Sequence, residues 1–503
     1  MNILFIITDQ QRMDHVGCYG NPDLKTPNLD RLAEEGVHFT NSYCTAPMCM
    51  PNRATIFTGK YPNIHGVRCN GINLDPNIPT FTQTLLKNNY HTYSIGKIHL
   101  NFFGNPYSRK SHSEEALIPS IYTPKKKKKP HPKPYYGLDE VDMVIGHGDA
   151  VGGDYLDWVN QKAPDYYDLI KKRATQLFDK IMASSPIPEN IYQTSYITEK
   201  TISYLDRFSK GEYGEKNFFI HCSYPDPHHP VCPPGRYKNM YDPEKIEISS
   251  NLHDIERLYN HEVLGKYVNV YRPNWLRETT EEELRQFLAY SYGTISMIDN
   301  SIGQILAALR SFKLEDETMV IFTSDHGDLM GDHGLLLKGP AHFSGTLKVP
   351  LIWKIPGVTK SGSISNSLVS SIDIPKTILR FLKIKEEHYP IGIQGKDLNP
   401  ILKNSEEKVR DCVIIEEDEQ SQKDSHNLPS IRLRSMVTKK YRLTLYENFE
   451  NYGDLYNLEE DPLEENNLWE NHAYQKIKNK LIRKFTHELI KIQPHYPNKQ
   501  ARA

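Results

Sequence analysis

The sequence predicts an α/β fold with a mainly parallel central sheet and a smaller α+β subdomain at the C-terminal end. Strand-like runs alternate with helix-like ones, and the strand-like runs are mostly apolar along their length. Near residue 413 the residue pattern changes to β-like runs followed by a turn-rich segment and an amphipathic helix. Such alternation is typical of parallel sheets covered by helices. Continuous apolar runs are typical of strands buried on both faces.

Strands and one long helix form the framework of this prediction. Four runs are short and rich in β-branched or aromatic residues. They cover Asn2–Thr8, 217–222, 319–323 and 349–353. Residues 282–312 instead carry apolar residues at helical spacing, which predicts a helix packed on the sheet. The apolar positions are Leu284, Phe287, Leu288, Ile295, Ile298, Ile302, Ile305, Leu306 and Leu309. Gly293 marks a place where this helix could be interrupted.

Residues 101–180 differ in composition, being rich in Pro, Tyr, Gly and Lys with weak periodicity. We expect an insertion in the main domain that forms a solvated, mobile loop. The insertion holds a lysine run at 125–129, followed by Pro130, Pro132 and Pro134. An alternative interpretation of this run is an electropositive arm that attracts a polyanionic substrate.

The C-terminal segment predicts a separate subdomain. Two β-like runs, 435–437 and Tyr441–Tyr446, precede a turn-rich segment and an amphipathic helix over about 474–492. We place the boundary near Leu402, which gives a main α/β domain at 1–402 and a subdomain at 403–503. Tyr456 and the acidic residues around it are expected to be solvated turn residues.

Size and charge exclude several classes of protein. The chain has 503 residues, more than one core usually holds, so two packed units are expected. With 61 basic and 63 acidic residues, the net charge of -2 indicates no nucleic-acid partner. No apolar run reaches the roughly 18 residues that a membrane-spanning helix requires, so no membrane association is expected.

The N-terminus and the cysteines point to a cytoplasmic protein. Asn2–Thr8 is apolar but short, without a basic flank or a small-residue cleavage site, so we expect a buried strand rather than a signal peptide. Seven cysteines, an odd number spread over a long chain, do not form a disulfide framework. Most of them are expected to be small buried apolar residues, and Cys49 alone has neighbours that suggest chemistry.

Acidic residues follow two of the expected strands. Asp9 and Gln10 come directly after the first strand, and Asp325 and His326 come after the strand at 319–323. Ligands of open α/β sheets gather at the carboxyl ends of the strands, so these residues predict one shared site. Carboxylates with an amide oxygen and an imidazole suit Ca²⁺, Mg²⁺ or Mn²⁺. The alternative is that the aspartates are ordinary turn residues or helix caps.

Cys49 precedes an expected helix. Residues 54–58 can form a helix whose N-terminus lies near 49–53, and the free amides there favour an anion. Arg53 adds a positive charge suited to oxyanions. A cysteine in such a field is a candidate nucleophile. The alternative is a buried cysteine before a proline-started helix.

Several segments resemble the formylglycine-dependent sulfatases of the alkaline phosphatase superfamily. Residues 49–53 fit C-x-P-x-R, the sulfatase motif in which the cysteine is oxidised, and residues 94–99 resemble the second signature with G-K-x-H at its centre. Residues 222–230 resemble the segment with a substrate-facing histidine. Residues 324–328 with Lys338-Gly339 look like the second metal-and-lysine segment. Residues 453–468 resemble the usual turn of the C-terminal subdomain, and all segments occur in the family's order.

This resemblance implies a fold, an activity and a set of site residues. The fold would be a three-layer α/β/α sandwich with a C-terminal α+β subdomain. A formylglycine-generating maturation enzyme would convert Cys49, and a divalent metal, with Ca²⁺ expected before Mn²⁺ or Mg²⁺, would bind in the same site. The metal ligands implied are Asp9, Gln10, Cys49, Asp325 and His326. The catalytic residues implied are Cys49, Arg53, Lys97, His99, His228 and Lys338, of which Lys97, His228 and Lys338 would also bind the substrate.

The implied reaction is hydrolysis of the sulfate monoester of a small molecule or a saccharide, by an enzyme that could form a homo-oligomer. Three positions depart from the family pattern. Gln10 stands where a second aspartate is common, Met50 where a small residue is usual, and Asn52 where Ser or Ala is usual. Gln10 together with His326 is similar to the branch that includes phosphonate monoester and phosphodiester hydrolases. Hydrolysis of those esters is therefore the alternative function.

Other interpretations remain open at this point. A phosphate mutase of the same superfamily would require serine or threonine at position 49, and a non-catalytic binding protein would leave Cys49 unmodified. His147 and Asp149 could line the pocket. A zinc site is a further alternative for a histidine- and cysteine-rich segment, although the spacing does not fit the usual paired ligands. Its residues would be His221, Cys222, His228, His229 and Cys232.

Overall fold

The computed structural model of the chain describes residues 1–104, 112–117, 121, 131–177, 180–271, 280–419 and 430–494. The lysine run at 125–129 lies outside these residues. The strands are β1 Asn2–Thr8, β2 Val37–Phe39, β3 Ser42–Tyr43, β4 Tyr90–Gly96, β5 Glu140–His147, β6 Ala150–Gly153, β7 Asn217–Tyr224, β8 Thr318–Ser324, β9 Leu351–Lys354, β10 Ser363–Ser365, β11 Val369–Ser370, β12 Val413–Glu419, β13 Ile431–Val437, β14 Tyr441–Tyr446 and β15 Gly453–Asn457.

The α-helices that frame these strands are named in the same chain order. They are α1 Pro27–Glu34, α2 Cys49–Thr58, α3 Pro62–His65, α4 Phe81–Lys87, α6 Asp154–Lys162, α7 Tyr167–Gln176, α8 Gln193–Ser209, α9 Ile255–Tyr259, α10 Leu264–Tyr271, α11 Glu281–Ser311, α12 Ser344–Leu347, α13 Asp373–Phe381, α14 Asn399–Lys403 and α15 Gln475–Lys491. Within the described parts of the chain, no helix is both long enough and apolar enough to cross a membrane.

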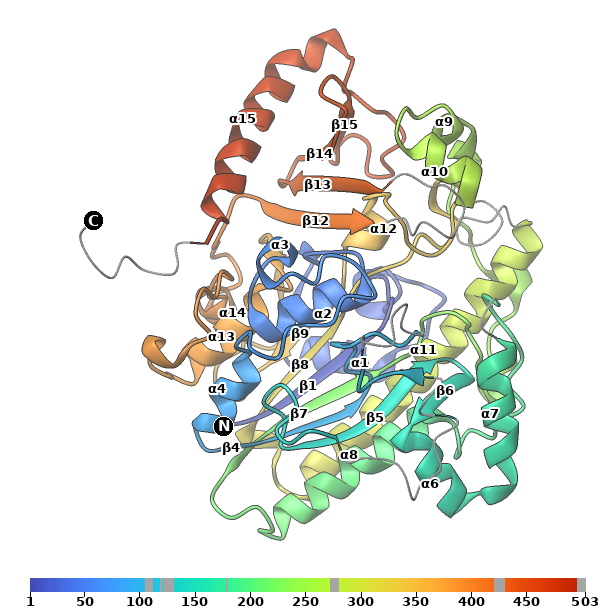
Figure 1. The fold of residues 1–503 in the computed structure, drawn as a ribbon, viewed down its shortest axis with the longest axis vertical. Coiled ribbons are helices and arrows are strands. Elements are labelled where there is room, and N and C mark those ends of the chain that lie inside the picture. The colour runs from blue at the N-terminus through green and yellow to red at the C-terminus, as the bar shows by residue number, and fades with distance from the viewer. Residues whose placement is uncertain are drawn as a thin grey trace.

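A nine-stranded sheet runs through the main domain in the order β10-β2-β9-β8-β1-β7-β4-β5-β6 (Figure 1). The five central strands β8, β1, β7, β4 and β5 are parallel to one another. Strand β9 pairs antiparallel with β8, and β6 pairs antiparallel with β5. Every residue of β1 is buried. The prediction of a mainly parallel sheet is therefore confirmed.

Helices cover both faces of this sheet, and the alternating side chains of β7 show how. Phe219 packs edge-on against Phe81 of α4, and His221 packs edge-on against Phe57 of α2. On the opposite face, Phe218 contacts Tyr204 of α8. Helix α8 in turn packs along α11. The main domain is thus the three-layer α/β/α sandwich that the sequence predicted.

Helix α11 is continuous through Gly293, where the sequence allowed an interruption. It begins with a capping box in which Thr280 accepts from the Glu283 amide and the Glu283 side chain accepts from the Thr280 amide. A Cβ atom at Gly293 would lie 2.2 Å from the carbonyl oxygen of Tyr237. The glycine therefore allows a neighbouring segment to approach the helix rather than breaking it.

The prediction of a mobile loop at 101–180 is wrong for much of that region. β5 pairs in parallel with β4, β6 returns antiparallel beside it, and α6 and α7 follow. The two strands extend the central sheet, as the teal segments of Figure 1 show. Strand β5 was not predicted because polar residues flank its short apolar stretch. Pairing with β4 stabilises the strand in the folded protein.

The C-terminal segment forms a four-stranded antiparallel sheet, β12 to β15, with α15 packed on one face (Figure 1). β14 has the predicted bounds, and α15 lies within the predicted 474–492. The opposite face packs against the main domain: Val413 and Ile415 lie in one buried cluster with Tyr43 and Leu347. The division into domains at residue 402 stays a prediction.

The prediction that Tyr456 lies in a solvated turn is wrong. Tyr456 lies on β15 and is fully buried, and Asp454 beside it is buried as well. Arg442 of β14 packs over the Tyr456 ring and pairs with Glu464. The sequence shows acidic residues in a turn-like context, but the buried arginine that neutralises them is separated from them along the chain.

Candidate active site

Residues from distant parts of the sequence meet at the carboxyl end of the parallel sheet. Asp9 follows β1, Lys97 follows β4, His228 follows β7 and Asp325 follows β8. Backbone hydrogen bonds hold these strand ends together: the Asp325 amide donates to Thr8 O at 3.1 Å, and the Lys97 amide donates to Ser223 O at 3.1 Å. The geometry agrees with the expectation that ligands collect at this edge.

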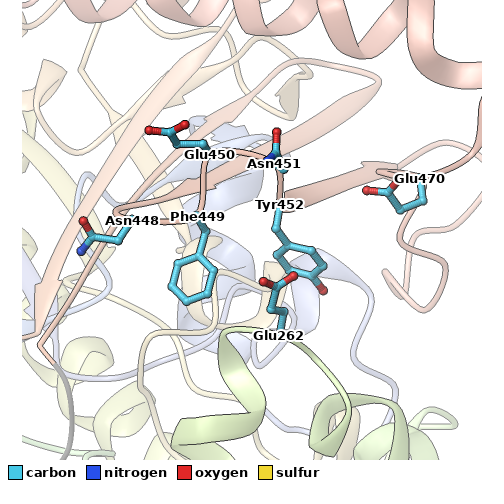
Figure 2. Close-up of a pocket in the computed structure, with 7 residues that line it drawn as sticks. All are labelled: Glu262, Asn448, Phe449, Glu450, Asn451, Tyr452 and Glu470. Carbon is cyan, nitrogen blue, oxygen red and sulfur yellow. The ribbon is translucent and has the colours of Figure 1, made fainter.

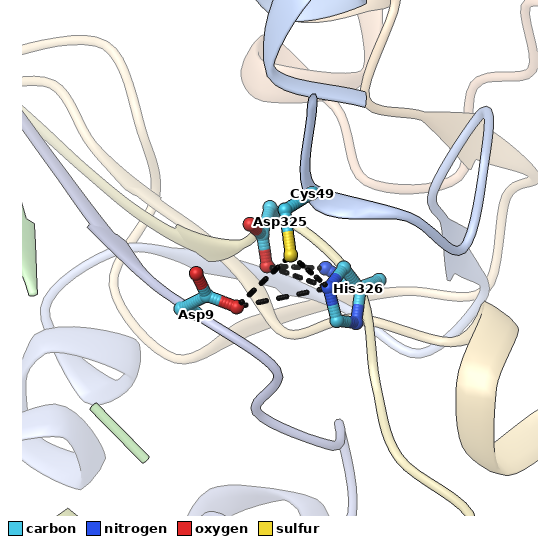
Figure 3. Close-up of side chains that lie close together, drawn as sticks. All are labelled: Asp9, Cys49, Asp325 and His326. Carbon is cyan, nitrogen blue, oxygen red and sulfur yellow. Dashed lines mark hydrogen bonds and ion pairs between the residues drawn. The ribbon is translucent and has the colours of Figure 1, made fainter. Parts of the chain in front are cut away.

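Cys49 lies against this edge as the first residue of α2. Its Sγ lies 3.1 Å from Nε2 of His326 and 3.6 Å from Oδ1 of Asp9. Figure 3 shows the four side chains of Asp9, Cys49, Asp325 and His326 converging. One potential ligand atom from each lies within 4.8 Å of the others, and all four residues are buried. Among the residues that the structure describes, no other group of His, Cys, Asp and Glu side chains meets this criterion.

Gln10 completes the set of predicted metal ligands. It has a positive φ of 63°, a conformation that non-glycine residues adopt infrequently. Its amide donates to Oδ1 of Asp325 at 3.0 Å, and its side-chain Oε1 accepts from Nζ of Lys338 at 2.7 Å. In this conformation, the backbone amide and the side-chain Oε1 of Gln10 both face residues of the Cys49 site.

Three buried cations surround the cluster. Arg53 donates from Nε to Asp325 at 2.7 Å, and its Nη2 lies 3.6 Å from Asp9. Lys97 forms a close ion pair with Asp9. Lys338 reaches in from a different loop, and its Nζ lies 3.2 Å from Sγ of Cys49 and 2.8 Å from Nε2 of His228. The sequence-predicted residues Arg53, Lys97, His228 and Lys338 are thus brought together.

Stacked histidines form one wall of the site. The ring of His228 stacks on His147 with centroids 3.7 Å apart, and on His229 at 4.1 Å. Nε2 of His147 lies 2.8 Å from Nζ of Lys97. His99 lies farther out, stacked on Phe103 at 3.8 Å, with its ring centroid 6.5 Å from that of His147. His99 is therefore the predicted catalytic residue with the most peripheral position.

Burial and charge shift the pKa values of these groups. Burial alone would raise the pKa of Asp9, but Lys97, Arg53 and Lys338 hold it well below its usual value. Burial, His147 and Lys338 all lower the pKa of His228, which favours its neutral form. Burial and Asp9 oppose ionisation of Cys49, yet Lys338, Lys97 and His326 bring the pKa of its thiol below the usual value. The site is therefore built to hold negative charge at position 49.

Some neighbours of the cluster were not assigned from the sequence. Ser223 on β7 accepts from Arg53 at 2.9 Å. Asn52 accepts from the hydroxyl of Ser371 at 2.7 Å and so fixes the start of α2.

Of the two residues that the sequence suggested could line the pocket, His147 contacts the cluster through Lys97, whereas Asp149 pairs with Arg173 at 2.7 Å. The G-H-G-D motif signalled His147, but no sequence pattern marked Ser223 as a partner of Arg53.

The zinc alternative does not fit the structure. His221 and Cys222 point to opposite faces of β7, because successive side chains of a strand alternate. The ring of His221 packs against Phe57, and Cys222 accepts from Thr201 of α8. Neither residue belongs to the group of potential metal ligands around Cys49.

A cavity of about 440 Å³ lies elsewhere, over the turn between β14 and β15 (Figure 2). Its lining residues are Glu262, Asn448, Phe449, Glu450, Asn451, Tyr452 and Glu470. It shares no residue with the Cys49 cluster. Three glutamates would repel a sulfate or phosphonate, so we assign no role in the reaction to this cavity.

Comparison with known families agrees with this geometry. The family model described as "Sulfatase" matches residues 1–144 and 146–384, which cover most of the chain. The chain belongs to the sulfatase family. A second model, described as "N-sulphoglucosamine sulphohydrolase, C-terminal", matches residues 331–491 of this sulfatase. Membership of the family makes the protein an enzyme that hydrolyses sulfate esters, as the motifs predicted.

Individual relatives show the breadth of the family. The sulfatase is 29% identical to an arylsulfatase of Clostridium perfringens over 94% of this chain and 91% of the relative. Its fold is similar to that of a phosphonate monoester hydrolase of Agrobacterium radiobacter, with a TM-score of 0.77, 22% identity and coverage of 98% and 96% of the two chains. It is also similar to a structure described as a complex with the substrate D-glucosamine-2-N,6-O-disulfate, with a TM-score of 0.72, 21% identity and 99% coverage of both chains.

Proposed function

We propose that this sulfatase cleaves a sulfate monoester at residue 49, with formylglycine as the nucleophile and a divalent metal beside it. The single observation that carries the proposal is the position of Cys49 Sγ. It lies within 3.6 Å of a cation from one loop, Lys338, and of Asp9 and His326 from two strand ends. In a matured enzyme, an oxygen of residue 49 would occupy the place of this sulfur.

Oxidation of Cys49 by a formylglycine-generating maturation enzyme provides a nucleophile that a cysteine cannot provide. The hydrated aldehyde carries two hydroxyls on one carbon, one of which attacks sulfur while the other can release sulfate and restore the aldehyde. A serine or cysteine ester would lack this internal exit. The surrounding cations Lys97, Lys338 and Arg53 are suited to hold the negative charge that such an attack requires.

The donor atoms around residue 49 fit a divalent cation. Asp9, Gln10 and Asp325 contribute oxygen atoms, which Ca²⁺ prefers, and the imidazole of His326 leaves Mn²⁺ or Mg²⁺ as alternatives. A bound cation would polarise the transferring group and favour deprotonation of the nucleophile. Arg53 would keep the two carboxylates in place, because it contacts Asp325 at 2.7 Å and Asp9 at 3.6 Å.

The remaining residues divide between anion binding and proton transfer. Lys97 and Lys338 approach the cluster from different loops and would contact different oxygens of the sulfate. The pair formed by Lys338 and His228, with Nζ and Nε2 at 2.8 Å, is placed to deliver a proton to the leaving alcohol. His99 is the weaker candidate for this role because its ring packs on Phe103, beyond His147.

The alternative function is hydrolysis of phosphonate monoesters or phosphodiesters by the same residues. Gln10 with His326 supports it, because this pair resembles the branch of the family that includes phosphonate monoester and phosphodiester hydrolases. Both ester classes carry a single negative charge at a tetrahedral centre, as a sulfate monoester does. The alcohol part is proposed to be a saccharide or an aryl group, in line with the named substrates of the relatives.

A substrate panel separates these possibilities. The enzyme would be produced with a maturation enzyme, and conversion of Cys49 would be verified by an intact-mass loss of about 18 Da, which follows from composition. We expect kcat/KM for an aryl or saccharide sulfate to exceed that for an aryl phosphonate or phosphodiester by at least about tenfold. The reverse order would select the alternative function. Cys49→Ala is the matched control, and residual activity within roughly tenfold of the wild type would rule out position 49 as the nucleophile.

A further inference from the structure

Lys338 lies at the centre of the site but on a segment without regular structure. Residues 335–343, between the short helix η8 (Asp332–Gly334) and α12, belong to no helix or strand. The Lys338 ammonium nevertheless contacts Gln10, Cys49, His228 and His326 within 3.2 Å. A long flexible side chain keeps such a position only if the backbone that carries it is fixed.

His342 fixes this segment four residues after Lys338. The ring is buried, and both of its nitrogens have partners on the C-terminal sheet: Nδ1 lies 2.7 Å from Oγ of Ser435 on β13, and Nε2 lies 2.9 Å from Oε2 of Glu417 on β12. Glu417 lies opposite Leu433, two residues from Ser435, so both side chains point from the same face of the sheet. His342 therefore lies on one face of the sheet and bridges side chains of two neighbouring strands.

The hydrogen bonds around His342 have one consistent direction. A carboxylate only accepts, so Nε2–H of His342 donates to Glu417, and Nδ1 then accepts from the Ser435 hydroxyl. Ser435 Oγ in turn lies 2.7 Å from Oγ1 of Thr444, which can donate to it. Burial keeps the pKa of His342 well below its usual value, which agrees with a neutral ring. The same segment of the chain is bound a second time two residues after His342, where the Ser344 amide donates to Glu464 at 2.6 Å.

We propose that the C-terminal sheet holds the catalytic lysine in place through His342, which makes His342, Glu417 and Ser435 positioning residues for the reaction. This inference rests on the role proposed above for Lys338. None of the three residues contacts the Cys49 cluster. They act by fixing the backbone from which Lys338 reaches the sulfate, and a displacement of about 1 Å at such a group costs up to about a hundredfold in rate.

The site would then be assembled from two structural units. The proposed metal ligands Asp9 and Asp325 follow strands of the main sheet, whereas the position of Lys338 depends on β12 and β13. Removing the contacts between Lys338's segment and β12 or β13 should therefore weaken stabilisation of the transition state without releasing the metal. This separation of effects distinguishes a positioning role from a general loss of stability.

The test measures kcat, KM and metal content of His342→Ala. We expect kcat to fall by about tenfold to a hundredfold at unchanged metal content, with KM changed by less than about threefold. Glu417→Gln keeps an acceptor for Nε2–H and should retain kcat within about threefold of the wild type, whereas Glu417→Ala should resemble His342→Ala. A wild-type kcat in His342→Ala would overturn the proposal.

Met436→Ala is the matched control. Met436 is fully buried on β13 but packs on the opposite face of the sheet, in the cluster that includes Phe485 of α15. It should lower the melting temperature and leave kcat unchanged. A fall in kcat equal to that of His342→Ala would overturn the positioning role. If His342→Ala does not fold, Ser435→Ala removes one of the two ring contacts, and an unchanged kcat in that variant would also overturn it.

A double variant connects the effect to the lysine. In a Lys338→Ala background, His342→Ala should reduce kcat by no more than about threefold further, because both changes remove the same interaction. Additive losses would mean that His342 acts elsewhere and would overturn this inference alone. A wild-type kcat in Lys338→Ala would instead remove the role of Lys338 in the proposed function, and the positioning role with it.

Discussion

At the scale of single residues, the site is defined by charges that have been taken out of water. Two buried carboxylates, Asp9 and Asp325, face the three buried cations Arg53, Lys97 and Lys338. Buried charges are tolerated only when they are paired and hydrogen-bonded. Each carboxylate contacts Arg53, but Lys338 contacts neither and instead points at Cys49 and His228. Its charge is therefore available for an anion at position 49.

The two lysines should matter more in the transition state than in the ground state, because charge develops on the leaving oxygen as the ester bond breaks. We expect Lys338→Ala to lose roughly 2.7–4 kcal/mol of barrier lowering, by analogy with removal of one preorganised donor. Lys97→Ala should lose a similar amount, and the double variant should fall short of additive if both lysines hold one sulfate. Steady-state kinetics would measure this as lower kcat and kcat/KM.

The contrary result for the lysines is a small rise in KM with an unchanged kcat in both variants. That pattern would mean that Lys97 and Lys338 only attract the anion. Loss of the ion pair with Asp9 is a complication specific to Lys97→Ala. Metal content measured beside kcat in this variant therefore separates an effect on Asp9 from an effect on the sulfate.

At the scale of elements, the ends of β1 and β8 supply the carboxylates. The two strands are in parallel register, with Thr8 opposite Ser324, so Asp9 and Asp325 emerge side by side. We expect Asp9→Ala and Asp325→Ala each to lose bound metal as well as rate, because removing one charged ligand weakens the whole site. Elemental analysis of the purified variants would test this expectation. Full occupancy in both would place the metal elsewhere.

Helix α11 offers a test of packing that is independent of the chemistry. Gly293 lies where the segment around Tyr237 crosses the helix, and a Cβ atom there would lie 2.2 Å from the backbone oxygen of Tyr237. Alanine favours a helix over glycine by about 1 kcal/mol, but this clash should cost about 1–3 kcal/mol and outweigh the gain. Gly293→Ala should therefore lower the melting temperature. A higher melting temperature would show that the crossing segment moves without cost.

At the scale of the whole molecule, the C-terminal sheet is part of the main domain's packing. Val413, Ile415 and Val437 share a buried cluster with residues of the main domain. The same sheet holds His342, and Glu464, in the segment after β15, accepts from the Ser344 amide. A chain ending at residue 402 would expose this apolar face and lose the partners of buried polar groups. We expect it to be insoluble or to lack a cooperative unfolding transition, as measured by circular dichroism on heating. A stable, cooperatively folded product would show that the two units are independent.

Much of this arrangement could be predicted, because local patterns determine it. The apolar runs predicted β1, β7 and β8, since burial of a strand on both faces leaves a continuous apolar run. Helical spacing predicted α11, since burial of one stripe of a helix leaves a period in the sequence. The motifs around Cys49, Lys97 and Lys338 predicted the candidate site residues and the family. The strands β4 and β5 were not predicted, because polar residues such as His91 and Asp142 interrupt their apolar pattern.

The sequence by itself determined which residues carry chemical groups and which segments must be buried. For the partners that no motif or strand end marked, only the tertiary structure decided which of these groups meet. Arg53 contacts Ser223, His147 contacts Lys97, and His342 contacts Glu417, and the partners of each pair are 50 residues or more apart in the chain. The physical reason is that a strand or helix pattern is a local property, whereas the pairing of buried charges depends on strand order and register. Those follow from the packing of the whole chain.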